Sequence, residues 1–106
     1  MAGPWVLIAG TTGTIDGRVV GEGDAYTQTV QAFRNVEAAL ASAGATLADV
    51  VQTRMFVTDI ARWEEVGRAH RELFGDIRPV SAMLGVAALI DPAMLVEVEA
   101  VAWLER

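Results

Sequence analysis

The groups that could carry chemistry in this chain are carboxylates, hydroxyls and arginines, because the other reactive side chains are nearly absent. There is no cysteine, and all eight basic residues are arginines. A thiolate nucleophile, a thiolate metal site and a Schiff-base amine are therefore excluded. The single histidine, His70, cannot build a multi-histidine metal site, and the sequence has neither a G-x-G-x-x-G fingerprint nor a phosphate-binding loop. We expect any catalysis to need no metal and no organic cofactor.

Two residues are the leading candidates for catalysis. Glu97, the first glutamate of E-V-E-A, could act as a general acid or base or orient a water molecule. An equally weighted alternative makes it an interface glutamate paired with Arg54, whereas Glu99 is interpreted as structural. Ser81 could bind a ligand by a hydrogen bond. As a nucleophile it would need a base, and His70 would have to lie beside it.

The remaining candidates have more modest predicted roles. His70 belongs to the apolar stripe of a predicted helix, so we interpret it as a half-buried, hydrogen-bonded histidine rather than a catalyst. Met83 and Thr11 are predicted to line a pocket. The three tryptophans are interpreted as packing anchors rather than as a stacking site; they are Trp5, Trp63 and Trp103.

Charge and composition exclude several classes of function. The net charge is −6 with a pI of about 4.6, so no basic stripe is available to neutralise nucleic-acid phosphates. The apolar runs are short, and neither a signal sequence nor a lipidation motif is evident, which argues against membrane association. A cytoplasmic location is the default expectation.

The elements that must position these residues can be read from hydrophobic spacing. The 106 residues suit one domain, spanning 1–106, that buries roughly 65% of its unfolded surface. The run W-V-L-I-A, residues 5–9, predicts a buried strand, and a glycine-rich loop with a turn at Asp16-Gly17 follows it. Asp24 is a natural N-cap for a helix to about Ala43, where Gly44 would end it.

The second half of the chain predicts a strand, a helix and two further strands. In residues 50–58, alternation places Val51, Thr53, Met55 and Val57 on a core face and the other side chains opposite. The second helix is expected to begin at Asp59 or Ala61, to end near Phe74, and to bury a face that includes Trp63, Val66 and His70. Further strands are expected at 81–89 and 95–104. This succession favours an α+β sheet with both helices on one side.

The sheet face opposite the helices should be mixed in character. It would carry an arginine, two glutamates and two aromatic rings, namely Arg54, Glu97, Glu99, Phe56 and Trp103. Such a face is too varied for a dry core and too apolar for open water. Self-association through it is the simplest resolution.

The order of these pieces resembles a known family. The segment T-R-M-F-V-T-D is followed by the helix W-E-E-V-G-R-A-H-R-E-L-F, then by R-P-V-S and by L-V-E-V-E-A. From Trp5 to Trp103 this succession resembles the YjgF/RidA family, whose better-known members hydrolyse reactive enamines and imines. The resemblance implies a chorismate-mutase-like fold, a homotrimer, and small-molecule clefts between its subunits. It also implies that the family's first strand is absent or truncated here.

The resemblance assigns roles to individual residues. An arginine that binds the substrate carboxylate follows the proline in family deaminases, and Ser81 stands at that position here. Glu97 matches a glutamate that positions the attacking water. A turn that contacts substrate reads Ala9-Gly10-Thr11, which makes Gly10 and Thr11 substrate-binding candidates. Arg78 is close in sequence to Ser81, but strand alternation does not put it at the same position, so we expect it to contact substrate differently.

Two further family positions differ: a helix asparagine falls at Gly67, and a nearby tyrosine falls at His70. Because serine lacks the charge and the bidentate geometry of a guanidinium, we expect a specificity different from that of the arginine-bearing deaminases. The leading expectation is a cofactor-free enzyme for a small imine, enamine or carbonyl compound. The alternative is a non-catalytic small-molecule-binding or chaperone-like trimer, and an endoribonuclease is disfavoured by charge.

Overall fold

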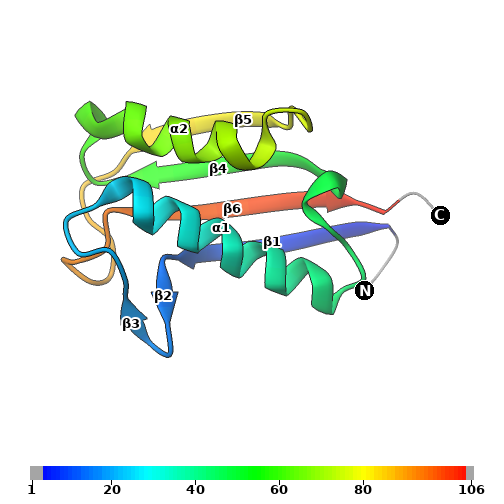
Figure 1. Ribbon diagram of the computed structural model, residues 1–106, viewed down its shortest axis with the longest axis horizontal. Coiled ribbons are helices and arrows are strands. Elements are labelled where there is room, and N and C mark those ends of the chain that lie inside the picture. Colours follow the sequence, from blue (N-terminus) through cyan, green and yellow to red (C-terminus); the bar gives the residue numbers. More distant parts are fainter. Residues whose placement is uncertain (1–3, 105–106) are drawn as a thin grey trace.

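The computed structural model describes residues 4–104, which form a four-stranded mixed sheet covered on one face by two helices (Figure 1). The strands of this sheet are β1 (Trp5–Thr12), β4 (Val50–Val57), β5 (Val80–Gly85) and β6 (Val96–Trp103), and the helices are α1 (Ala25–Ser42) and α2 (Trp63–Phe74). The strand order is β1-β6-β4-β5, with β6 antiparallel to both of its neighbours and β5 parallel to β4. The predicted α+β class is confirmed. Short 3₁₀ turns at Leu47–Asp49 and Ile60–Arg62 precede β4 and α2.

Helix α1 begins and ends where its sequence predicts. The Asp24 side chain accepts a hydrogen bond from the Thr27 backbone N–H at 3.1 Å, so it caps the helix and its pKa is lowered by that bond. Gly44 follows the helix with φ of 80°, and the Ala45 N–H bonds back to the Leu40 carbonyl at 2.8 Å. A residue with a Cβ would be strained at that left-handed position.

Segments 10–23 and 81–89 differ from the prediction in detail. Strand β1 continues past Ala9 to Thr12, and a hairpin of β2 (Thr14–Ile15) and β3 (Arg18–Val19) follows it. Asp16 and Gly17 both have positive φ, as a two-residue type I′ turn requires. Strand β5 ends at Gly85 rather than at residue 89, because its partner strand β4 ends opposite it at Val57. Without a neighbouring backbone, the chain leaves the sheet there.

A bulge in β4 overturns one predicted core position. Val50 is buried and Val51 is 41% exposed, whereas alternation placed Val51 inside. The pairing of β4 with β6 shifts register between Val50 and Gln52, and the extra residue reverses the alternation before it. From Thr53 onward the predicted inward residues are correct.

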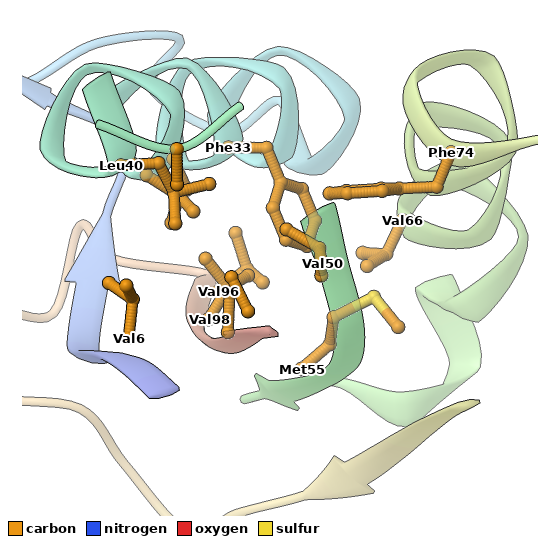
Figure 2. Packing of buried hydrophobic residues seen from close by; sticks show 14 of the residues in the cluster. Val6, Phe33, Leu40, Val50, Met55, Val66, Phe74, Val96 and Val98 are labelled. Atoms are coloured by element: carbon orange, nitrogen blue, oxygen red, sulfur yellow. The ribbon is translucent and has the colours of Figure 1, made fainter. Parts of the chain in front are cut away.

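The core fills the space between the helices and the sheet, as Figure 2 shows. Phe33 and Leu40 descend from α1, and Val66 and Phe74 from α2, onto β-strand residues that include Val98. The Phe33 and Phe74 rings pack edge to face with centroids 5.1 Å apart.

The tryptophans behave differently from one another. Trp63, expected on the buried stripe, begins α2 and is 53% exposed, because this first residue lies beyond the reach of the core. Trp5 and Trp103 pack against each other edge to face at 4.6 Å.

Between residues 4 and 104, neither helix combines the length and the apolar character needed to cross a membrane.

Candidate functional site

The face of the sheet turned away from the helices, here called the open face, carries the residues that alternate with the core. Strand register sorts it into successive rows. From one end to the other these are Trp5–Trp103, then Leu7–Val101–Gln52–Val80, then Glu99–Arg54–Ala82, then Thr12–Glu97–Phe56–Leu84. The first two rows are mainly apolar and the last two contain the charges. The open face therefore has an apolar end and a polar end.

The polar end centres on Glu97 and the backbone of Gly10. A Cβ atom at Gly10 would lie 2.6 Å from Glu97 Oε2, which means that the carboxylate rests against this residue. The approach is possible because Gly10 has no side chain and because β1 is bulged between Ile8 and Thr11. The structure thus brings together two of the predicted site residues, Glu97 and Gly10.

The Glu97 carboxylate has no hydrogen-bond or ion-pair partner among residues 4–104. The alternative that pairs it with Arg54 does not hold within the chain, since Arg54 Nη2 instead lies 2.8 Å from Glu99 Oε1. That contact is an ion pair by distance, although its angle falls outside hydrogen-bond geometry. Glu99 thus has the structural role expected of it, and Glu97 keeps a carboxylate available to a ligand or water.

Two neighbours of Glu97 were not among the predicted site residues, although Phe56 was expected on the same sheet face. Thr12 on β1 and Phe56 on β4 are its register partners and share its face of the sheet. Thr11 pairs with Val98, which faces the helices, and its hydroxyl donates to the Ala9 carbonyl at 2.8 Å. The bulge decides which threonine faces Glu97. An isolated glycine in a strand, here Gly10, is the sequence signal for such a bulge, but it does not fix the register that follows it.

The other predicted site residues lie on the helix-covered face or beside it. Ser81 pairs with buried Thr53, and Met83 pairs with Met55 and packs against the core, so both are on the face opposite Glu97. Arg78 precedes β5 with φ of 54°, and its N–H bonds to the Phe74 carbonyl at 3.0 Å. Its side chain is exposed at the turn between α2 and β5.

One chain therefore separates the predicted site into two half-sites. Glu97 and Gly10 occupy the open face, while Ser81 and Met83 lie near the sheet's β5 edge on the opposite face. A sheet lies between them, so the two groups can meet only if one copy presents its first half-site to the second half-site of another.

His70 contacts Thr53 and the aromatic core and does not lie directly beside Ser81. Its Nε2 lies 2.8 Å from Thr53 Oγ1, and its ring packs against Phe33 and Phe74 with centroids 5.6 and 4.9 Å away. Burial lowers the pKa of the imidazole, because the cation would lose its hydration there. This geometry matches the interpretation of a half-buried, hydrogen-bonded histidine, with Thr53 standing between it and Ser81.

The apolar end of the open face is hollowed. A groove of about 970 Å³ is lined mainly by apolar side chains, among them Trp5, Leu7, Val80 and Val101. Leu7 is 74% exposed and Val80 is 69% exposed. A second, smaller hollow of about 250 Å³ extends the groove toward Arg54 and Glu99.

Ion pairs neutralise several of the arginines in the described part of the chain. Three of its arginines, Arg34, Arg54 and Arg62, are paired with glutamates at 2.8–2.9 Å. Residues 4–104 also contain no cluster of three or more histidine, cysteine or acidic side chains that could hold a metal ion.

The four-stranded mixed sheet with two helices on one face places residues 4–104 among small α+β proteins, and comparison with known proteins identifies the family. The family model described as endoribonuclease L-PSP matches residues 1–104. The uncharacterized protein SCO2049 of Streptomyces coelicolor is 41% identical over 102 residues, which cover 96% of this chain and 76% of that protein.

Solved structures agree with this assignment. Rv2704 from Mycobacterium tuberculosis, described as a member of the YjgF/YER057c/UK114 family, is 54% identical with a TM-score of 0.88, covering 98% of this chain and 82% of its own. YyfB from Yersinia pestis, described as a protein of unknown function of the Rid family, is 34% identical with a TM-score of 0.84, covering 96% and 80%. The chain therefore belongs to the YjgF/RidA family, as its resemblance predicted.

Proposed function

We propose that this protein is a homotrimer that processes a small imine, enamine or carbonyl compound in clefts between its subunits, without a metal or an organic cofactor. Membership of the YjgF/Rid family supports a role in processing or binding small molecules. The observation that carries the finer proposal is the unpartnered Glu97 carboxylate held against Gly10.

Self-association is supported by two features of the open face. Its apolar end exposes Leu7, Val80 and part of Trp5 around one groove, and exposed apolar side chains that adjoin in this way are typical of interaction surfaces. The two half-sites also lie on opposite faces of the sheet. A neighbouring copy that covers the open face would bury the groove and bring its own Ser81 toward Glu97.

In the proposed reaction, Glu97 acts as the general base. It takes a proton from water as the water oxygen bonds to the carbon of the protonated imine, and the C=N electron pair moves to nitrogen, which gives a neutral carbinolamine. Glu97 then returns its proton to the nitrogen, the C–N bond breaks as ammonia leaves, and the hydroxyl oxygen forms the carbonyl as its proton passes to the Glu97 carboxylate. Transfer of that proton to ammonia restores Glu97, so the products are the carbonyl compound and ammonium. Phe56 beside Glu97 would limit access of bulk water and strengthen these interactions.

A second candidate, a non-catalytic binding protein, is favoured by one observation. Ser81 stands where family deaminases carry the arginine that binds the substrate carboxylate, and serine supplies no charge. Nucleic-acid cleavage, which the family model's description suggests, finds no support in a chain of net charge −6.

Ammonia release separates the two candidates. We would measure it from freshly generated 2-aminoacrylate and from the corresponding amide, with wild type, Glu97→Gln and Glu64→Gln. Glu64 is an exposed glutamate on α2 and serves as the matched control. Turnover that falls at least tenfold in Glu97→Gln alone supports the enzyme, as expected for loss of a general base. No turnover, with ligand binding unchanged in Glu97→Gln, supports the binding protein.

A further inference from the structure

On the helix-covered side of the sheet, three polar side chains lie one behind another, from the protein surface to its interior. Ser81 is exposed on β5, Thr53 beside it on β4 is fully buried, and His70 Nε2 is 2.8 Å from Thr53 Oγ1. Paired residues of adjacent strands project from the same face, and the strands are about 4.8 Å apart, so rotation about the Ser81 Cα–Cβ bond can bring its hydroxyl to that of Thr53. Within residues 4–104 the Ser81 hydroxyl makes no hydrogen bond, with Thr53 or with any other residue, so it is available to both Thr53 and a ligand.

His70, the innermost of the three residues, has an uncharged imidazole. The imidazole of His70 is flanked by Phe33 of α1 and Phe74 of α2, and its described polar contact is Thr53 of β4. Burial lowers its pKa, so the uncharged ring predominates near pH 7. No described carboxylate forms an ion pair with it that would favour the imidazolium.

A neutral imidazole lets the three groups bind either a donor or an acceptor. With the proton on Nδ1, Thr53 donates to Nε2, Ser81 donates to Thr53, and Ser81 accepts from a ligand N–H or O–H. With the proton on Nε2, each bond reverses and Ser81 donates to a ligand carbonyl. Consecutive hydrogen bonds in a region of low dielectric strengthen one another. A carboxylate, by contrast, would meet no positive charge in these three groups.

We propose that Ser81, Thr53 and His70 form a hydrogen-bond relay that binds an uncharged polar group, such as a carboxamide, where an arginine would bind a carboxylate. The inference rests on the proposed function, in which Ser81 lines the substrate cleft. It extends that function by assigning a substrate class: compounds whose end at Ser81 is neutral. It also gives buried Thr53 and His70 a role in substrate selection as positioning residues.

His70 is the only histidine in the chain, so its imidazole resonances can be identified in NMR spectra without ambiguity. The experiment titrates full-length protein with pyruvamide and, separately, with pyruvate, which have the same shape and differ in charge. We expect pyruvamide to shift the ring ¹⁵N resonances of His70 saturably. Its affinity should be at least about tenfold higher than that of pyruvate, which corresponds to the free energy of about one hydrogen bond. Equal affinities, or no shift at His70 on pyruvamide binding, overturn the proposal.

Variants test whether the effect passes through the relay. Ser81→Ala should abolish the His70 shift, and Ser42→Ala, which alters the only other serine, should leave it intact. Thr53→Ser should keep the His70 shift. Thr53→Val should abolish it, and this variant should still bind pyruvamide, although with lower affinity than the wild type. A His70 shift that persists in Ser81→Ala or Thr53→Val refutes the relay. If one of these variants fails to fold, the wild-type comparison of the two ligands still decides the substrate class.

The ammonia assay with Glu97→Gln tests the proposed function independently of the relay. Loss of turnover in Glu97→Gln together with no pyruvamide preference would retain the proposed function and refute the relay. A pyruvamide preference without any turnover would retain the relay and leave the binding protein as the function.

Discussion

Glu97 and Gly10 occupy adjoining space at the polar end of the open face, with the Glu97 carboxylate oxygen filling the position that a side chain at residue 10 would need. The two residues are far apart in sequence and are brought together because β1 and β6 are neighbouring antiparallel strands. The predicted site thus depends on a glycine whose role is to leave room for a carboxylate.

Replacing Gly10 by alanine should damage the site more than the fold. The new Cβ would lie 2.6 Å from Glu97 Oε2, the end of a flexible side chain that can move away. We expect the free energy of unfolding to fall by less than about 1 kcal/mol and turnover or ligand affinity to fall about tenfold or more, as displacement of a catalytic group costs. Urea titration and the ammonia assay measure the two quantities.

Gly67→Ala is the matched control for this change. Gly67 lies within α2, and its added Cβ would meet only Arg71 Nη1 at 3.8 Å. The substitution should therefore stabilise the protein by about 0.5–1 kcal/mol without affecting activity. Full activity in Gly10→Ala would contradict the proposed position of the Glu97 carboxylate.

Introducing a charge on the open face should disrupt the trimer. Val101 lies centrally in the row that joins Leu7 to Gln52. An arginine there would bury an unpaired charge between copies, which costs several kcal/mol. Sedimentation should show a trimer for wild type and a folded monomer for Val101→Arg, with Ala38→Arg on the outer side of α1 remaining trimeric. A wild-type monomer at micromolar concentration would remove the basis for intersubunit clefts.

The buried His70 should make stability depend on pH in a defined window. Its pKa is lowered in the folded protein by burial, so below about pH 6.5 the unfolded chain binds a proton that the folded chain does not. The free energy of unfolding should therefore decrease as pH falls from about 6.5 toward the folded pKa and should level off below it. Urea titrations between pH 7.5 and 5 should show this slope in wild type and lose it in His70→Gln. An identical slope in both proteins would assign the dependence to other groups.

Gln28 should be a major determinant of stability. It is fully buried in α1, donates to the Gly21 and Ala93 carbonyls at 3.2 and 2.9 Å, and accepts from the Leu95 N–H at 2.8 Å. Gln28→Leu leaves the Ala93 carbonyl and the Leu95 N–H without partners, while the Gly21 carbonyl still accepts from the Asp24 N–H, and it should cost about 2–4 kcal/mol. Gln31→Leu, which removes one partly buried bond to Asn35, should cost less. Equal losses in urea titration would show that the Gln28 bonds are replaced by water.

Prediction from sequence succeeded where local spacing and burial agree. Phe33, Val36 and Leu40 recur at helical spacing and are buried, and Asp24 and Gly44 delimit α1. It missed Gln28, because a polar residue is buried only if distant backbone groups satisfy it, and those groups belong to loops at 21 and 93–95.

In the candidate site, too, the identity of residues could be predicted from the sequence, whereas their contacts could not. Glu97 and Gly10 were identified individually from the family resemblance, but their contact depends on the bulge in β1. One alternative assigned Arg54 an ion pair with Glu97, whereas strand register places Arg54 opposite Glu99, with which it forms the ion pair. Thr53 was recognised as inward-facing, yet its bond to His70 needed the position of α2 over β4.

By itself, the sequence determined the α+β class and the residue types available for chemistry, because composition, periodicity and caps are local properties of the chain. The family was identified from the resemblance of its motifs, taken in order along the chain. Only the tertiary structure decided that Ser81 and Glu97 lie on opposite faces of the sheet. That separation follows from strand register and bulges, which arise from the pairing of backbones distant in sequence and shift a side chain from one face to the other with a single added residue.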